Sequence, residues 1–272
     1  MVNGYRPLSL KEALEIRSTQ DVVPYAGGTD LMVEDRKGVS YLFLNQIPEL
    51  KEIREEGQYI RIGAAVTFTE ALESGLIPPL MKEALARIAA PAIRNAGTFG
   101  GNIGNGSAKA DSVLICFAAD AKLRLLSVDG ERVIDINQFY KGRKELDLRS
   151  DELIAEVLLP KTGIDNYYYK KVGGRNALAI SRVSFAGVIN LDGDIIRHVA
   201  AAFGAVSGMV LRMRDLEQML EGKTLAQAKE LKPRLLELYA ERMELTRGRV
   251  SAEYRKAVCM NLLNDFLSEK GI

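Results

Sequence analysis

The sequence predicts an α+β fold in two parts, with a change of character near Gly163. Before Gly163, short strand patterns alternate with short helix patterns that carry capping signals. After it, two long strand patterns flank a tight turn, and the chain is then helical to its end. With 272 residues, 47% of them hydrophobic, the chain is long enough for one large domain or two modest ones.

The N-terminal segment, residues 1–50, has the pattern of a small α/β unit. Ser9 and Glu12 have the spacing of a capping box and stand before an apolar helical stripe. Strands are predicted over 21–26 and 41–44, and the first of them runs directly into a pair of glycines.

The rest of the first part continues this alternation. A strand is predicted over 59–64, a second capping box at Thr67 and Glu70, and a helix from Pro78 to Ile88. After a glycine-rich stretch, the predicted elements are a helix over 113–119, a hairpin of 122–128 and 132–136 around Asp129-Gly130, and a strand over 153–159.

The second part is a small antiparallel sheet followed by helices. A strand begins at Tyr167, and a hairpin is predicted from 184–191 and 195–203, because Asp192-Gly193 is a strong turn signal. The predicted helices cover 216–220, 225–240 and 254–267, and the last carries an apolar stripe at helical spacing.

The composition excludes several classes of function. Lys and Arg total 37 and Asp and Glu total 36, so there is no basic excess of the kind that nucleic-acid binding needs. Cys116, Cys259 and His198 are too few to ligate an iron–sulfur cluster or to build a zinc site without carboxylates. No apolar run is long enough for a membrane helix. Few cysteines and the lack of a signal peptide predict a cytoplasmic protein.

The first informative motif reads Ala26-Gly27-Gly28-Thr29-Asp30-Leu31. Two adjacent glycines after a strand allow close approach of a ligand to the backbone, and their N–H groups can form an anion-binding concavity. Gly-Gly alone is also typical of a plain strand-to-helix turn, so the motif by itself leaves both interpretations open.

The second motif runs from Asn95 to Ser107, and five of the ten residues from Gly97 to Gly106 are glycine. A surface linker can be this rich in glycine, but Phe99 and Ile103 are poor linker residues. Glycine density costs conformational entropy, and close contact with a phosphate-bearing ligand would offset that cost. Neither a P-loop nor a complete dinucleotide fingerprint is present. We therefore expect a second loop that faces the first across a diphosphate.

Together the two motifs resemble the flavin-binding subunit of the molybdenum hydroxylases, the xanthine dehydrogenase and carbon monoxide dehydrogenase group. That family shows Ala-Gly-Gly-Thr/His-Asp/Ser-Leu near residue thirty, and Arg-Asn-x-Gly-Thr-Ile-Gly-Gly-Asn-Ile near residue one hundred. Here the second pattern reads Arg94 to Ile103. The similarity continues through Leu159-Pro160 and over 169–175, so it covers nearly the whole chain.

The resemblance implies a fold and a cofactor. Residues 1–163 would form a PCMH-type FAD-binding domain of two α/β subdomains. Residues 164–272 would form a domain similar to the C-terminal domain of the carbon monoxide dehydrogenase flavoprotein, with a three-stranded sheet and a helical bundle. FAD is expected to lie extended between the two subdomains, bound without a covalent link, with its pyrophosphate on the first motif.

The same resemblance implies a set of cofactor contacts. Asp111 would contact hydroxyls of FAD, Ile88 and Ile154 would lie beside the cofactor, and Lys170 would lie near the flavin ring. The glycine motifs contribute the remaining contacts: Tyr25, Ala26, Gly27, Gly28, Thr29, Asp30, Leu31, Thr98, Phe99, Gly100, Gly101 and Asn102. The chain departs from the family after the second motif, where a proline is missing and two glycines are added. Ser107 and Lys109 are therefore not assigned as contacts.

Some of these residues also fit structural roles. Lys170 fits a solvated strand end, and Asp111 fits the charge of a helix N-terminus. His198 is predicted to be a half-buried strand residue, and Cys116 and Cys259 are predicted to pack in the core.

The resemblance implies an electron-transfer subunit of a heteromeric complex. A [2Fe–2S] partner would deliver electrons, a large molybdopterin subunit would oxidise the substrate, and this chain would pass electrons to NAD+ or another acceptor. Two alternatives stay open: a self-contained FAD oxidoreductase, and an assembly subunit that lacks FAD.

Overall fold

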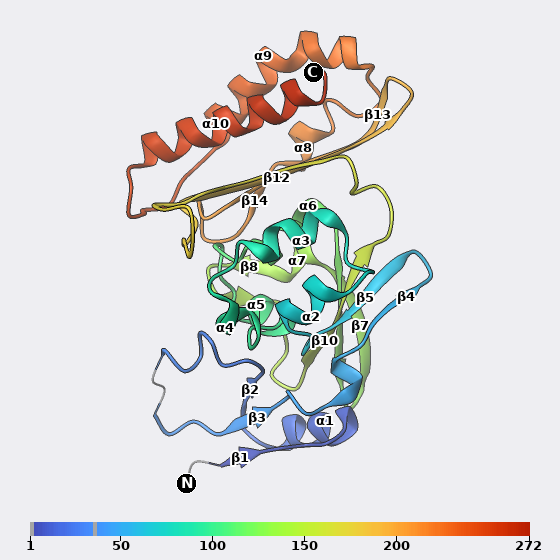
Figure 1. Cartoon of the computed structure of the whole chain (residues 1–272), viewed down its shortest axis with the longest axis vertical. Helices are drawn as coiled ribbons and strands as arrows, with labels where there is room; N and C mark the ends of the chain where they lie inside the picture. Colours follow the sequence, from blue (N-terminus) through green and yellow to red (C-terminus); the bar gives the residue numbers. More distant parts are fainter. Residues whose placement is uncertain (1–2, 35–36) are drawn as a thin grey trace. The chain divides into compact units, whose positions relative to one another are not determined.

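The computed structural model describes residues 3–34 and 37–272, which form two compact units (Figure 1). The first unit comprises the chain up to Ile77 together with Ile88–Ser107 and Asp120–Pro160. The second comprises Pro78–Arg87, Ala108–Ala119 and Lys161–Ile272. Both units mix helices with sheets, so the α+β prediction is confirmed.

A small parallel sheet opens the first unit. Its strand order is β1 (Gly4–Tyr5), β3 (Tyr41–Phe43) and β2 (Val23–Tyr25). The helix α1 (Leu10–Thr19) begins where predicted, because the Ser9 hydroxyl accepts a hydrogen bond from the Glu12 amide. The core of this region includes the fully buried residues Ala13, Leu42, Ile47 and Leu50.

A five-stranded antiparallel sheet forms the rest of the first unit. Its order is β4 (Ile53–Glu56), β5 (Tyr59–Gly63), β10 (Leu153–Pro160), β6 (Lys122–Ser127) and β7 (Gly130–Asp135). The central strand β10 is buried over all but its last residue. The shorter elements are η1 (Pro48–Leu50), α2 (Phe68–Glu73), α4 (Pro91–Arg94), α5 (Phe99–Gly104), α7 (Ile136–Phe139), β8 (Tyr140–Gly142) and β9 (Glu145–Leu146).

The second unit is built on an antiparallel sheet with helices on both faces. The strand order is β11 (Tyr167–Val172), β12 (Val183–Asp192), β13 (Ile195–Gly204) and β14 (Leu211–Arg212), so a two-residue strand is added to the three that were expected. This sheet lies between α3 (Pro79–Ala86) and α6 (Asp111–Ala118) on one face and the C-terminal helices on the other (Figure 1). The C-terminal helices are α8 (Arg214–Glu217), α9 (Leu225–Arg242) and α10 (Ala252–Glu269).

The helices α3 and α6 precede Gly163 in the chain but belong to the second unit. All eight residues of α6 are buried, and the helix packs on β12 and β13. A helix whose residues are all buried needs cover on every side, and the sheet supplies part of that cover. The boundary between two domains after residue 163 therefore stays a prediction.

Candidate cofactor site

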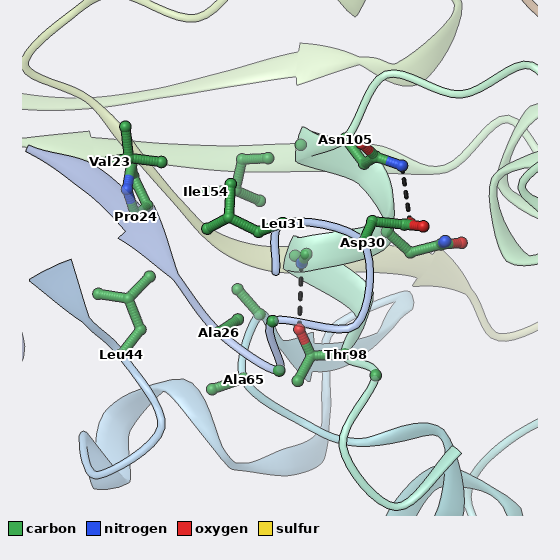
Figure 2. Close-up of a pocket in the computed structure, with 18 of the residues that line it drawn as sticks. Val23, Pro24, Ala26, Asp30, Leu31, Leu44, Ala65, Thr98, Asn105 and Ile154 are labelled. Carbon is green, nitrogen blue, oxygen red and sulfur yellow. Dashed lines mark hydrogen bonds between the residues drawn. The ribbon is translucent and has the colours of Figure 1, made fainter. Parts of the chain in front are cut away.

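The two glycine-rich motifs line one cavity of 320 Å³ in the first unit (Figure 2). Small-molecule sites in proteins usually measure roughly 300–1,000 Å³. Of the residues predicted as cofactor contacts, eleven line this cavity: Ala26, Gly27, Gly28, Thr29, Asp30, Leu31, Thr98, Gly100, Gly101, Asn102 and Ile154. The fold therefore brings eleven of the sixteen predicted contacts together at this cavity.

The first motif follows β2 and packs directly against the second. A Cβ atom on Gly27 would lie 1.8 Å from the carbonyl oxygen of Ala96, so only glycine permits this approach. Gly28 has a φ of +68°, a left-handed conformation that glycine adopts without strain. The close approach thus requires glycine at position 27, and the left-handed backbone favours glycine at position 28. Together the two residues bring the loop backbone to the cavity wall.

The second motif was expected to be a loop, and this was wrong: Phe99–Gly104 forms the helix α5. Thr98 caps it, since its Oγ1 accepts a hydrogen bond from the Gly101 amide at 3.1 Å. Phe99 and Ile103, one turn apart, are fully buried and anchor the helix in the core. The missed signal was this i, i+4 spacing of apolar residues behind a threonine cap.

One face of α5 presents bare backbone to the cavity. A Cβ on Gly104 would meet only the Cδ1 atom of Ile154, at 3.8 Å, and one on Gly101 would meet Thr98 Oγ1 at 3.0 Å. Gly101 and Gly104 both line the cavity and lie three residues apart, hence on the same side of the helix. This face leaves room for an extended ligand to lie against the helix.

Two polar contacts lie at this cavity, and one of them joins the two motifs. Asn105 Nδ2 donates a hydrogen bond of 2.8 Å to Asp30 Oδ2, and Figure 2 shows this bond beside the capping bond of Thr98. Lys144 Nζ lies 2.8 Å from Glu34 Oε1. The hydrogen bond between Asn105 and Asp30 joins the two motifs, and the pair of Lys144 with Glu34 lies beside them at the same cavity.

Arg17 is a cavity residue that the sequence analysis missed. Its Nη1 donates to the carbonyl of Val22, while its Nε is buried and has no hydrogen-bond partner among the residues that the structure describes. Burial lowers the pKa of the guanidinium, but arginine keeps its charge in proteins. The cavity therefore has a cation with an unused donor. No motif marks it, because Arg17 lies in α1, before β2 and the glycines in the sequence.

Five predicted contacts do not line this cavity. Phe99 is fully buried in the core and packs on the ring of Phe68. Tyr25 packs on Tyr41 and Phe43. The other three residues, Ile88, Asp111 and Lys170, lie elsewhere in the fold. The carbonyl of Ile88 accepts a hydrogen bond from Arg94.

Asp111 forms a buried polar cluster in the second unit. The carboxylate is 4% exposed, and its Oδ2 lies 2.7 Å from Lys171 Nζ. Ser181 donates a hydrogen bond of 2.9 Å to the other oxygen. Burial raises the pKa of Asp111, and the ammonium of Lys171 opposes that rise.

Lys170 does not join this cluster. Neighbouring side chains of a strand point to opposite faces, and Lys170 Nζ lies over the ring of Tyr168, 5.6 Å from its centroid. Lys171, on the other face, contacts both Asp111 and the carbonyl of Arg87. The structure thus groups Asp111 with Lys171, and a flavin contact by Lys170 stays a prediction.

Two family models match the chain. The model of the FAD binding domain in molybdopterin dehydrogenase matches residues 1–162. The chain belongs to this family. The model of the carbon monoxide dehydrogenase flavoprotein C-terminal domain matches residues 167–270.

Individual proteins that are similar to this chain have names consistent with this family. The chain is 32% identical over 212 residues to the xanthine dehydrogenase FAD-binding subunit of Escherichia coli O157:H7, covering 74% of this chain and 72% of that protein. It is 28% identical to the nicotine 6-hydroxylase medium subunit of Paenarthrobacter nicotinovorans, covering 97% of this chain and 95% of the relative. A solved structure of carbon monoxide dehydrogenase from Hydrogenophaga pseudoflava matches with a TM-score of 0.89 at 26% identity, covering 98% of this chain and 96% of that one.

Two features are absent from the residues that the structure describes. No group of three or more His, Cys, Asp or Glu side chains in that part of the chain could hold a metal ion. Within the same residues, no helix combines the length and the apolar character that crossing a membrane requires.

Proposed function

We propose that this chain binds FAD in the cavity between the two glycine-rich motifs and serves as the electron-transfer subunit of a molybdenum-containing hydroxylase. The observation that supports this most strongly is the pairing of both family motifs on one cavity, with the glycine face of α5 left open. The family match gives the cofactor its identity.

The residues present fit an extended dinucleotide. The backbone of the first motif and the side chain of Arg17 would hold the negative charge of the pyrophosphate. The bare backbone at Gly101 and Gly104 would let the chain of the cofactor lie against α5. Asp111, Ile88 and Lys170 remain proposed contacts carried over from the resemblance. FAD, when bound, supplies the redox chemistry, and the protein supplies binding, orientation and exclusion of water.

We propose partners that carry the redox centres for which this sequence has no ligands. Two cysteines and one histidine cannot ligate a pair of iron–sulfur clusters, so the clusters of the proposed electron route belong to another protein. We assign these clusters to a [2Fe–2S] subunit, and substrate oxidation to a large molybdopterin subunit. NAD+ is the proposed acceptor. The relatives' names include medium subunits and medium chains, which is consistent with assembly into a larger complex.

The test uses the purified chain and its native complex. The FAD-loaded chain alone, mixed anaerobically with a purine or an aldehyde, should keep its yellow absorption, whereas NADH should bleach it. The complex should bleach with its own substrate and contain iron and molybdenum. Rapid substrate oxidation by the isolated chain would instead identify a self-contained oxidoreductase. Failure of NADH to bleach the flavin would remove NAD+ as the acceptor.

A further inference from the structure

A second cavity, of 290 Å³, lies wholly within the second unit. The loop after β11, the end of β13 and the start of α10 contribute to its wall. Five of its lining residues are basic and none is acidic: Lys109, Arg175, Arg182, Arg249 and Arg255. Such a one-sided set of charges in a concave site attracts anions.

Arg255 supplies a buried charge at this cavity. The residue is 3% exposed and stands in the first turn of α10. Its Nη atoms contact the main-chain carbonyls of Thr246, Ala205 and Val206, and its Nε is buried without a hydrogen-bond partner among the described residues. No carboxylate forms an ion pair with it in that part of the chain. A buried guanidinium is costly without a counter-charge.

Two further arginines line the cavity, Arg182, which is half-buried, and Arg249, which is exposed. Within the described ranges, 3–34 and 37–272, neither has a carboxylate within ion-pair distance. Elsewhere in the same unit arginines are paired, as Arg212 is with Glu217 at 2.9 Å and Arg242 is with Asp215. The cavity thus gathers three arginines, Arg182, Arg249 and Arg255, that pair with no carboxylate among the described residues.

The rim adds an apolar surface to the charges. Ile180 lines the cavity and is 62% exposed, and Leu178, two residues before it, is 52% exposed. Arg175 fixes the loop that carries both, because its Nη2 donates a hydrogen bond of 2.6 Å to the carbonyl of Leu178. A ligand that places an anionic group among the arginines would find an apolar contact beside them.

We propose that this cavity binds the phosphate group of a small molecule. Guanidinium groups match the oxygens of phosphate in charge and in fork geometry. The concave shape favours a small molecule over a protein surface, and the apolar rim favours a phosphate attached to a base or another apolar group. The argument uses only the second unit and does not depend on FAD binding in the first.

The experiment is calorimetric titration of the full FAD-loaded chain at low salt with ADP, pyrophosphate, inorganic phosphate and adenosine. We expect ADP and pyrophosphate to bind and adenosine to fail, with affinity falling as salt screens the charges. Tighter binding of ADP than of pyrophosphate would identify a nucleotide as the source of the phosphate. Equal binding would identify the phosphate itself.

Arg182→Gln and Arg249→Gln test the assignment to this cavity. Each should weaken binding roughly tenfold, because a hydrogen bond to a charged group usually exceeds one tenfold step in affinity. Arg234→Gln, on the exposed side of α9, is the matched control and should change nothing. The flavin absorption should be the same in all three variants, which shows that they fold.

Three results would overturn the proposal. One is the absence of binding by any phosphate compound to the FAD-loaded chain. Another is binding that both cavity variants leave intact. The last is binding seen only after flavin removal and displaced by added FAD, since that would assign the cavity to the flavin.

Discussion

At the residue scale, the contrast between Lys170 and Lys171 shows how strand geometry decides which side chain meets Asp111. Lys171→Met should lower the free energy of unfolding by about 3–5 kcal/mol, because it leaves Asp111 buried without its cation. Lys170→Met is the matched control and should cost less than about 1 kcal/mol, since Lys170 is exposed. Denaturant unfolding of both variants measures the difference.

The pH dependence of stability in the Lys171→Met variant tests the same ion pair between Lys171 and Asp111. Burial already raises the pKa of Asp111, and loss of the ammonium would raise it further. A carboxyl with a higher pKa in the folded protein stabilises the folded state. This stabilisation is complete at pH values below the pKa of the unfolded protein, and it is lost as pH rises through the pKa of the folded protein. The penalty of the mutation should therefore be largest at neutral pH and shrink toward pH ~4. A penalty that is the same at both pH values would contradict the ion pair.

Arg17 provides a second test at this scale. Arg17→Gln should raise the dissociation constant for FAD roughly tenfold, because the substitution removes a positive charge from a residue that lines the cavity. Flavin fluorescence during titration of the flavin-free chain measures the change. Lys11→Gln, on the exposed side of α1, is the control and should bind FAD as the parent does. Equal affinities of both variants would place Arg17 outside the site.

At the scale of elements, α5 is the feature on which the cofactor proposal depends. Gly104→Ala should stabilise the flavin-free chain by up to about 1 kcal/mol through helix propensity, yet weaken FAD binding roughly tenfold. The added methyl meets only Ile154 at ordinary contact distance, so the fold should accept it. Gly28 is a poorer choice, because its φ of +68° and the nearby Tyr25 ring would disturb the loop itself.

The control for this variant is Gly75→Ala, whose Cβ meets nothing within 4 Å and does not line the cavity. Thermal unfolding and FAD titration of both variants separate stability from binding. If Gly104→Ala keeps full FAD affinity, the cofactor does not lie against this face of α5.

The strand β10 carries a buried charge cluster that predicts acid sensitivity. Glu156 is 3% exposed and pairs with Arg54, Arg61 and Arg124. Burial raises the pKa of Glu156, but these arginines outweigh it and hold the pKa below its usual value. The stability that Glu156 contributes with its arginines is present at pH values above its pKa in the unfolded chain, near 4.5. It is lost as pH falls through the lower pKa that Glu156 has in the folded protein.

Glu156→Gln should therefore cost about 1–3 kcal/mol at pH 7 and flatten the dependence of unfolding on pH between about 5 and 3. Urea unfolding across that range measures the effect. A variant as acid-sensitive as the parent would show that other carboxyls dominate acid unfolding.

Local signals in the sequence predicted the elements well. The capping box at Thr67 and Glu70 is present, and the turns at Asp129-Gly130 and Asp192-Gly193 join β6 to β7 and β12 to β13. His198 is a partly buried residue of β13, as predicted, and both cysteines are buried. These features depend on residues close together in the chain, which is why pattern alone finds them.

Features set by tertiary packing escaped the sequence analysis. The glycines of α5 oppose a helix by propensity, but burial of Phe99 and Ile103 overrides that preference. Arg17 lines the cavity because of the tertiary structure, and no local sequence pattern indicates it. The grouping of α3 and α6 with the C-terminal sheet likewise arises from contacts between segments far apart in sequence.

At the scale of the whole molecule, the central claim is that the chain binds one FAD without a covalent bond. Burial raises the pKa of Cys116 and Cys259 to about 12, so neither thiol supplies the thiolate that a flavin linkage would need. The glycine motifs contain neither Cys nor His.

The most direct test is the flavin content of the purified chain before and after acid precipitation. We predict one FAD per chain, all of it released into the supernatant with its yellow colour. A colourless chain that takes up no added FAD would contradict the cofactor site, and colour that stays in the pellet would contradict non-covalent binding.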